Sequence, residues 1–168
     1  MVEEQPQRGP TQGGGETVEE PTAVPTLDAA ELEAVQAALT ENLATFLDDT
    51  QNYNATTARE VQEALDAREF PFLVDVRCHS EVLAANSRYI AGAIVVPLQL
   101  LAYNVDRLPQ DKDTPIVVYG KSDADAAIGA MVIALLGYPD VKSMQGGSFN
   151  DWLAEGYATE TLIAAGPG

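Results

Sequence analysis

Short apolar runs alternate along the chain with longer stretches of helical periodicity, a pattern typical of an α/β domain. Ile116 to Tyr119 reads as a short, fully buried strand, and the apolar run from Ala126 to Leu136 predicts a buried helix. Similar runs predict three further strands and two further helices: strands at 72–76, 94–96 and 141–144, and helices at 57–67 and 149–155. This alternation predicts an open parallel sheet with helices on both faces.

The residues before the α/β domain divide into a tail and a helix. Residues 1–26 are rich in Glu, Gly, Pro and Thr and cannot bury enough apolar area to offset chain entropy, so we expect a disordered tail. An extra N-terminal helix is expected over 27–48, because Asp28 and Glu31 have capping-box spacing. It carries an apolar stripe formed by Leu32, Val35, Leu39, Leu43 and Phe46. The stripe either packs on the domain, which is the simpler interpretation, or forms a partner or dimer surface.

Composition narrows the classes of partner. The formal net charge of −17 excludes nucleic acid and anionic lipid, whose binding rests on clustered Lys and Arg. No apolar run reaches the ~20 residues of a membrane helix. The only cysteine, Cys78, excludes an intrachain disulfide. The first residues do not resemble a signal peptide. We therefore expect a cytoplasmic protein, or a tethered extracytoplasmic one if a targeting or lipid-anchor segment preceded residue 1.

The point where strand 116–119 leads into the next helix is the expected site. Ligands of open parallel sheets bind beyond the carboxyl ends of the strands, where a loop enters a helix N-terminus. The sequence predicts a six-residue binding loop here, made of Gly120, Lys121, Ser122, Asp123, Ala124 and Asp125. Two carboxylates are too few for a specific metal site, so we expect neither a metal nor a cofactor.

Five segments, in order along the chain, resemble signatures of the rhodanese-like domain family. They are residues 73–77, 89–98, 115–119, 136–141 and 146–157. We therefore expect a rhodanese-like domain over residues 53–160. The resemblance implies sulfur carried as a persulfide on a cysteine that directly follows the tyrosine of the central strand. It also implies that loop N–H groups, the helix dipole and a loop arginine stabilise the thiolate and an anionic substrate.

The sequence departs from this family pattern at the residues that carry the chemistry. The nucleophile position is Gly120, which has no side chain to hold sulfur. Asp123 stands where the family commonly has glycine, and Asp125 stands where it has arginine. If both carboxylates point into the anion cradle, each opposes an anion by roughly 3 kcal/mol at ~5 Å and an effective dielectric of ~20. Because the family has a cysteine here, we expect the backbone at Gly120 to accept one.

Cys78 is the residue that could supply a thiol from a neighbouring strand. It follows the strand at 72–76, with Arg77 and His79 beside it. Adjacent residues in an extended chain point apart, which disfavours a Cys–His pair, so a passive thiol is the favoured interpretation. Asp75 and Arg77 share one face of their strand, and we expect them to support the loop through hydrogen bonds.

The sequence thus predicts a rhodanese-like domain that has lost the persulfide-forming cysteine. The favoured function is a non-catalytic binding or regulatory module with an unknown protein or small-molecule partner. The alternative is a sulfurtransferase-type or other enzyme that uses Cys78 near the loop. By itself the chain is expected to be a monomer, or a weak dimer through the N-terminal helix.

Overall fold

The computed structural model describes residues 27–48, 54–82 and 87–161, so the tail expected at residues 1–26 lies outside the described part. Five parallel strands form the central sheet in the order β1-β6-β5-β2-β4. Their bounds are Ala55–Thr57 for β1, Phe72–Asp75 for β2, Ile94–Val95 for β4, Ile116–Tyr119 for β5 and Val141–Gln145 for β6. Two further strands, β3 at Arg88–Ile90 and β7 at Thr159–Thr161, pair antiparallel beside this sheet.

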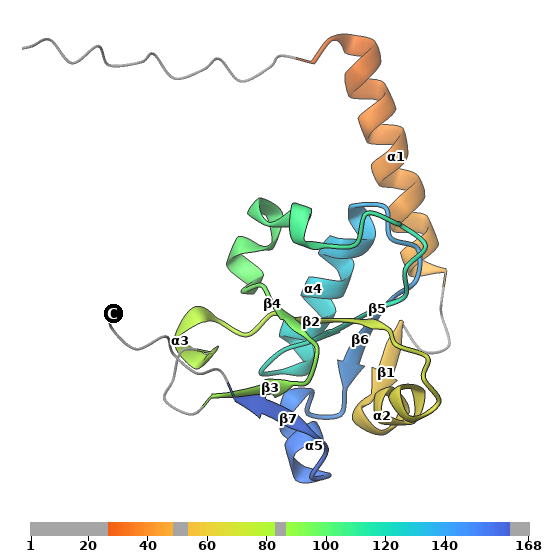
Figure 1. Ribbon diagram of the computed structural model, residues 1–168. Helices are drawn as coiled ribbons and strands as arrows, with labels where there is room; N and C mark the ends of the chain where they lie inside the picture. The colour runs from red at the N-terminus through yellow and green to blue at the C-terminus, as the bar shows by residue number, and fades with distance from the viewer. Residues whose placement is uncertain (1–26, 49–53, 83–86, 162–168) are drawn as a thin grey trace, which may run out of the picture.

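Alternation along β5 divides the interior into two cores, one on each face of the sheet. Ile116 and Val118 join a core with α4 (Asp123–Leu135) and the 3-10 helix η1 (Leu98–Tyr103). Val117 and Tyr119 join a second core with α2 (Ala58–Asp66) and α5 (Phe149–Ala154). The short helices α3 (His79–Val82) and η2 (Val105–Arg107) complete the domain. Helices on both faces of a parallel sheet confirm the predicted fold class (Figure 1).

Three short strands were not predicted, because pairing rather than local sequence forms them. β1 lies in a stretch where no strand was predicted, yet it pairs with β6 in the register Ala55 to Ser143. β3 and β7 each have only three residues and pair with each other. Three-residue strands carry too little periodicity to be recognised without their partners.

The N-terminal helix α1 (Ala29–Leu47) forms as expected but does not pack as expected. Its capping box is complete: Asp28 accepts from the Glu31 amide at 2.8 Å, and Glu31 accepts from the Asp28 amide at 2.8 Å. No residue of α1 is buried, so the interpretation that its stripe packs on the domain is wrong for most of its length. Only the last turns are attached, where Phe46 packs against the core and Asn42 donates to the Leu135 carbonyl at 3.2 Å. The rest projects beyond the domain (Figure 1).

Candidate functional site

The connection from β5 to α4 is three residues long rather than the predicted six. Ser122 is the N-cap of α4, and its hydroxyl accepts from the Asp125 amide at 3.2 Å. The helix therefore starts at Asp123, and Asp123, Ala124 and Asp125 form its first turn. The sequence prediction was wrong here because a serine followed by two acids is a strong helix start.

The two aspartates have different partners, and Asp123 does not point into an anion cradle. Its carboxylate accepts from the amides of Gly146 at 3.1 Å and Gly147 at 2.9 Å, in the turn after β6. Both glycines have positive φ, at 89° and 113°, and this turn directs their amides toward the Asp123 carboxylate. Asp125 accepts instead from the Ser122 hydroxyl at 2.8 Å. The expectation that two carboxylates oppose an anion in the loop is therefore wrong for Asp123.

Gly120 is held on both sides by the segment that starts α5. Its amide donates to the Ser148 hydroxyl at 2.9 Å, and its carbonyl accepts from the Phe149 amide at 3.2 Å. The next carbonyl, that of Lys121, accepts from the Asn150 side chain at 3.3 Å. Ser148 is fully buried, so this tether lies inside the protein. The connection after β5 is thereby fixed to the turn after β6.

The space beside Gly120 is filled as well. A Cβ at this position would lie 2.9 Å from Asp125 Cβ and 3.3 Å from Val76 Cγ2. The backbone of Gly120 does not have a positive φ, so its conformation suits other residues, as expected. The surrounding atoms do not leave room for a cysteine. A thiol at position 120 would require the first turn of α4 to move.

Asp75 and Arg77 form a buried ion pair at the end of β2. Arg77 Nη2 lies 2.5 Å from Asp75 Oδ2 and also donates to the Arg88 carbonyl at 2.7 Å, while the guanidinium lies 4.0 Å from the centre of the Phe149 ring. Burial, followed by the Asp75 carboxylate, raises the pKa of Tyr119 well above its usual value, and its hydroxyl accepts from the Ile90 amide at 3.0 Å. The pair therefore ties β2 to β3 and α5, and its described hydrogen bonds do not reach residues 120–125.

Cys78 lies close to Lys121 of the connection. The Cys78 amide donates to Glu81 Oε2 at 3.1 Å, and its sulfur lies 3.1 Å from the Ser80 hydroxyl. Glu81 Oε1 forms an ion pair with Lys121 at 2.7 Å. The Lys121 ammonium, and then the hydrogen bonds from Cys78, lower the pKa of Glu81. Glu81 thus holds the one cation of the connection while the thiol stays half-buried.

Two residues of this arrangement were missed from the sequence. Glu81 stands three residues after Cys78, the spacing of a capping box, so a signal for its bond to the Cys78 amide was present. Ser148 gave no such signal, because its contact with Gly120 depends on a left-handed backbone with φ of 52° and on the packing of α5 under β5.

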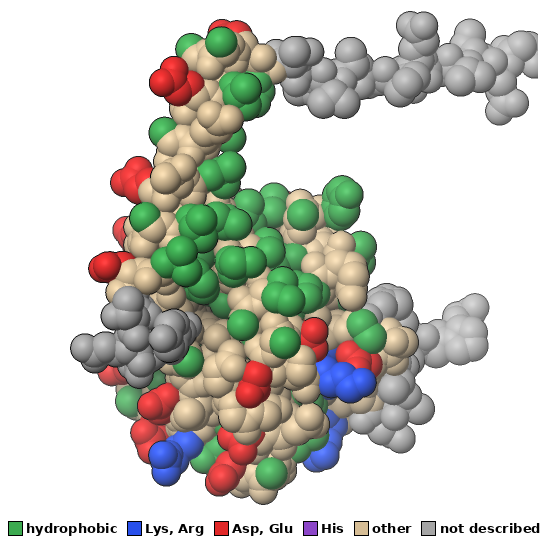
Figure 2. All heavy atoms as spheres, turned by 180° about the vertical axis from the view of Figure 1, so that it is seen from behind, with side chains coloured by type: hydrophobic (Ala, Val, Ile, Leu, Met, Phe, Trp, Pro, Cys, Tyr) green, Lys and Arg blue, Asp and Glu red, His purple; other side chains and the backbone are tan. Residues whose placement is uncertain are grey.

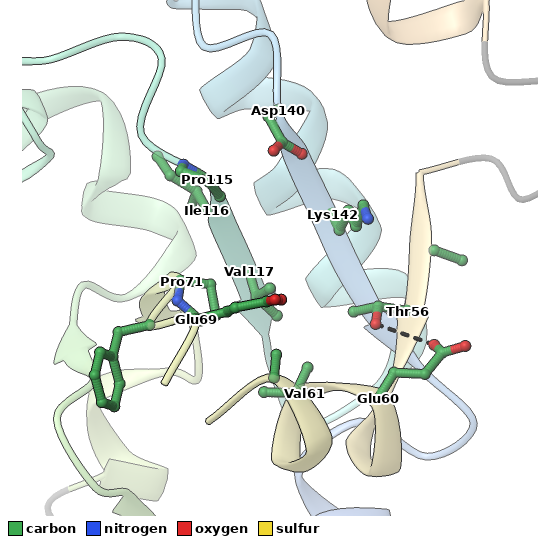
Figure 3. Close-up of a pocket in the computed structure, with 13 residues that line it drawn as sticks. Thr56, Glu60, Val61, Glu69, Pro71, Pro115, Ile116, Val117, Asp140 and Lys142 are labelled. Carbon is green, nitrogen blue, oxygen red and sulfur yellow. Dashed lines mark hydrogen bonds between the residues drawn. The ribbon is translucent and has the colours of Figure 1, made fainter. Parts of the chain in front are cut away.

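A cavity of about 580 Å³ lies at the opposite edge of the sheet, beside the amino ends of β2, β5 and β6 (Figure 3). α2 forms one wall, and Glu60 on it accepts from the Thr56 hydroxyl at 3.1 Å. Polar side chains from several elements line the cavity: Thr56, Glu60, Glu69, Asp140 and Lys142. A smaller cavity of about 260 Å³ lies between α1 and residues 137–139. Residues 120–125 line neither of these two cavities.

In the described part of the chain, no three His, Cys, Asp or Glu side chains gather in an arrangement that could hold a metal ion. Within the same ranges, no helix has the length and apolar character needed to cross a membrane.

The model of the Rhodanese-like domain family matches residues 57–155, and the chain belongs to this family. Two structures of one Anabaena protein are similar to the chain. The NMR structure of its Rhodanese-like domain has 26% identity and a TM-score of 0.56, and the match covers 67% of this chain and 83% of that one. The crystal structure has 27% identity and a TM-score of 0.56, with 66% and 95% covered.

A rhodanese-related protein from Thermoplasma volcanium shares the fold. It has 22% identity and a TM-score of 0.52, and the match covers 63% of this chain and 96% of that one. No curated protein matches the chain.

Proposed function

We propose that the protein is a rhodanese-like domain without its persulfide-forming cysteine, in which Gly120 takes the nucleophile position, and that it works as a non-catalytic binding or regulatory module. The observation that carries the proposal concerns the connection after β5: its backbone groups at Gly120 are already bonded, and the space beside Gly120 is already filled. Ser148 and Phe149 bind the two backbone groups of Gly120, and Asp125 fills the space where a side chain would stand.

Hydrogen bonding in the connection supports the same conclusion. A persulfide site needs backbone amides free to bind a thiolate or an anionic substrate. The amides of Gly120, Asp125 and Ala126 already donate within the chain, the first to Ser148 and the other two to Ser122. An anion bound through these three amides would have to displace their bonds, whereas the amides of residues 121–124 have no acceptor among the described residues. We infer that the residues of the connection now stabilise the fold.

One observation favours the second candidate, an enzyme that works through Cys78. The thiol is half-buried and lies at the carboxyl edge of the sheet, close enough to Lys121 for the two groups to interact electrostatically. Lys121 is already paired with Glu81 at 2.7 Å, however, so its ammonium is bound by a carboxylate rather than by the sulfur. The non-catalytic module is therefore the preferred function.

Sulfur transfer from thiosulfate to cyanide tests both candidates. The full chain should show no turnover above the buffer rate, and at pH 7 Cys78 should react with an alkylating reagent no faster than free cysteine. Cys78→Ser is the matched control, since it removes only the thiol. Turnover in the wild type that disappears in Cys78→Ser would establish the enzyme and overturn the proposal.

A further inference from the structure

The projecting part of α1 presents an unpartnered apolar stripe. Leu32, Val35 and Leu39 are 49%, 43% and 44% exposed, and Leu43 is exposed as well. Most helical stability in proteins comes from packing an amphipathic face rather than from intrinsic propensity. Among the described residues, nothing packs on the first turns of α1 in this way, because within the helix only Asn42 and Phe46 are half-buried. A helix built in this way indicates a surface that is covered by another molecule.

The stripe continues onto the domain. α1 contacts α4, and α4 contacts η1, so the three elements lie side by side. Large apolar side chains are exposed on these neighbours too: Ile128, Met131 and Leu136 on and after α4, and Leu100, Tyr103 and Val105 on η1 and η2. Figure 2 shows hydrophobic side chains gathered along α1 and onto the domain beneath it, with acidic side chains along the outer edge of the helix. We call ten exposed side chains the apolar face: these six, together with Leu32, Val35, Leu39 and Leu43 of the α1 stripe.

We propose that the apolar face is a self-association surface, on which a second copy of this chain packs with the same face in a two-fold dimer. In such a dimer, the projecting helix of each copy covers apolar side chains of the other, so one surface supplies both halves of the contact.

Charge selects a second copy over other occupants. At roughly 100° per residue, the flanks of the stripe are Gln36, Ala38, Thr40 and Asn42, all uncharged. Glu33 and Glu41 lie toward the back of the helix, and Glu31 is held in the capping box. Two copies can therefore bring their α1 stripes together with uncharged flanks on both sides.

The same distribution disfavours a basic partner or an anionic membrane. A basic partner helix would be recognised by acids beside the stripe, where α1 has only Glu31, and its carboxylate is already bonded in the capping box. An anionic membrane requires Lys or Arg, and the sequence has neither between Arg8 and Arg59.

The area of the apolar face fits a weak dimer. Complete burial of an aliphatic side chain contributes about 1.5–3 kcal/mol at ~25 cal/mol per Å², which corresponds to roughly 60–120 Å² of apolar surface. Ten side chains about half exposed thus offer on the order of 500 Å². This is as much as the largest apolar patch of a typical monomer, roughly 300–600 Å², and it is more than half of the ~800 Å² that each partner buries in a standard interface.

Sedimentation equilibrium of the full chain tests the proposal through two matched substitutions on α1. Leu39→Glu places a carboxylate at the centre of the stripe. Ala37→Glu places the same carboxylate on the opposite side of the same helix, about 160° away. We expect the wild type to dimerise with a micromolar dissociation constant. We expect Leu39→Glu to weaken the dimer by roughly tenfold or more, and Ala37→Glu to change it by less than about twofold.

A third variant tests the part of the apolar face outside α1, so its result does not depend on the folding of that helix. Tyr103→Glu alters an 83% exposed side chain on η1, and it should weaken the dimer by more than Ala37→Glu does. Added salt should strengthen the dimer, because it screens the repulsion between two chains of net charge −17. A wild type that stays monomeric at about 200 µM in ~0.5 M salt would overturn the proposal. Equal effects of Leu39→Glu and Ala37→Glu would overturn it as well.

Discussion

The two ends of the parallel strands are built in different ways. Beyond the carboxyl end of β5 the chain uses its own groups: Ser148 and Phe149 bind Gly120, Asp123 binds two glycine amides, and Glu81 binds Lys121. At the amino ends of β2, β5 and β6 the chain leaves a cavity of about 580 Å³. Within the described residues, the side-chain ammonium of Lys142 in the cavity wall makes no hydrogen bond or ion pair.

This contrast separates two ways of locating a site. The fold predicts chemistry at the carboxyl edge, because strand ends and helix N-termini meet there. In this chain, hydrogen bonds at the carboxyl ends of the strands join the segment after β5 to the segment after β6. The cavity lies instead at the amino ends of the strands. A fold therefore indicates where a site can form, and the unoccupied groups of the particular chain decide whether one is present. Four predictions test the contrast, in order of decreasing effect.

Breaking the buried ion pair at the carboxyl edge should have the largest effect. Arg77→Leu leaves the Asp75 carboxylate, which is fully buried, without its partner. Loss of one partner from a buried pair costs about 3–5 kcal/mol, so we expect a loss of unfolding free energy of about 3 kcal/mol, measured in urea. Arg88→Leu is the control, because only the Arg88 carbonyl takes part and its side chain is exposed. Similar small losses of unfolding free energy in Arg77→Leu and Arg88→Leu would show that the buried ion pair does not stabilise the carboxyl ends of the strands.

Adding atoms at Gly120 should have the next largest effect. Gly120→Ala and Gly120→Cys both introduce a Cβ 2.9 Å from Asp125 Cβ, and overpacking of this kind costs about 1–3 kcal/mol. We expect no sulfur transfer in Gly120→Cys. Asp125→Arg would not relieve the clash, because arginine keeps the Cβ.

A double-mutant cycle of Gly120→Cys with Asp125→Gly identifies the clash directly. Removing the Asp125 Cβ should recover part of the loss, with a favourable coupling of about 1 kcal/mol or more in urea unfolding. The Asp125→Gly single variant is the control, since glycine in a helix has its own cost. Additive losses would mean that the clash lies elsewhere, for example against Val76.

Features that depend on neighbouring residues could be predicted from the sequence. The capping boxes of Asp28 with Glu31 and of Thr57 with Glu60 are both present, because each joins residues three apart. The strand Ile116–Tyr119 was predicted with its bounds, since all four residues are buried and apolar.

Features that depend on distant partners could not be predicted. Asp123 looks like a loop carboxylate until the glycine turn after β6 supplies two amides for it. The stripe of α1 looks like a buried face, since periodicity shows that a face is apolar and does not show what covers it. In the sequence, Ser148 is only the residue before a predicted helix. Its hydrogen bond with Gly120, which is distant in the sequence, shows that it holds the connection after β5 in place.

The unfolding free energy should depend slightly on pH through Glu60, which lies beside the cavity at the amino ends of the strands. The Thr57 amide, followed by the hydroxyls of Thr56 and Thr57, lowers the pKa of this carboxyl below 4.5. A lowered folded-state pKa gives stability that is present above about pH 4.5 and is lost as the pH falls through the folded value. Glu60 is exposed, so after solvent screening we expect Glu60→Gln to cost at most about 0.5 kcal/mol at pH 7. The variant should equal the wild type near pH ~3.

Glu63→Gln is the control for Glu60, since it makes the same change on the same helix outside the capping box. Urea unfolding at several pH values measures both variants. If the gap between wild type and Glu60→Gln kept its size at the lowest pH, the effect would not come from the carboxylate form of Glu60.

Filling the cavity should have the smallest effect. Ala64→Leu adds three carbons to a half-buried side chain that lines the cavity, and leucine has nearly the helix propensity of alanine. We expect the unfolding free energy to change by less than about 0.5 kcal/mol, although Gly120→Ala adds only one carbon and costs more. Ala58→Leu on the same helix is the control, because Ala58 is fully buried and should lose about 1–3 kcal/mol. A loss above about 1 kcal/mol in Ala64→Leu would mean that α2 packs too closely on the sheet for an open cavity, and the contrast between the two edges would disappear.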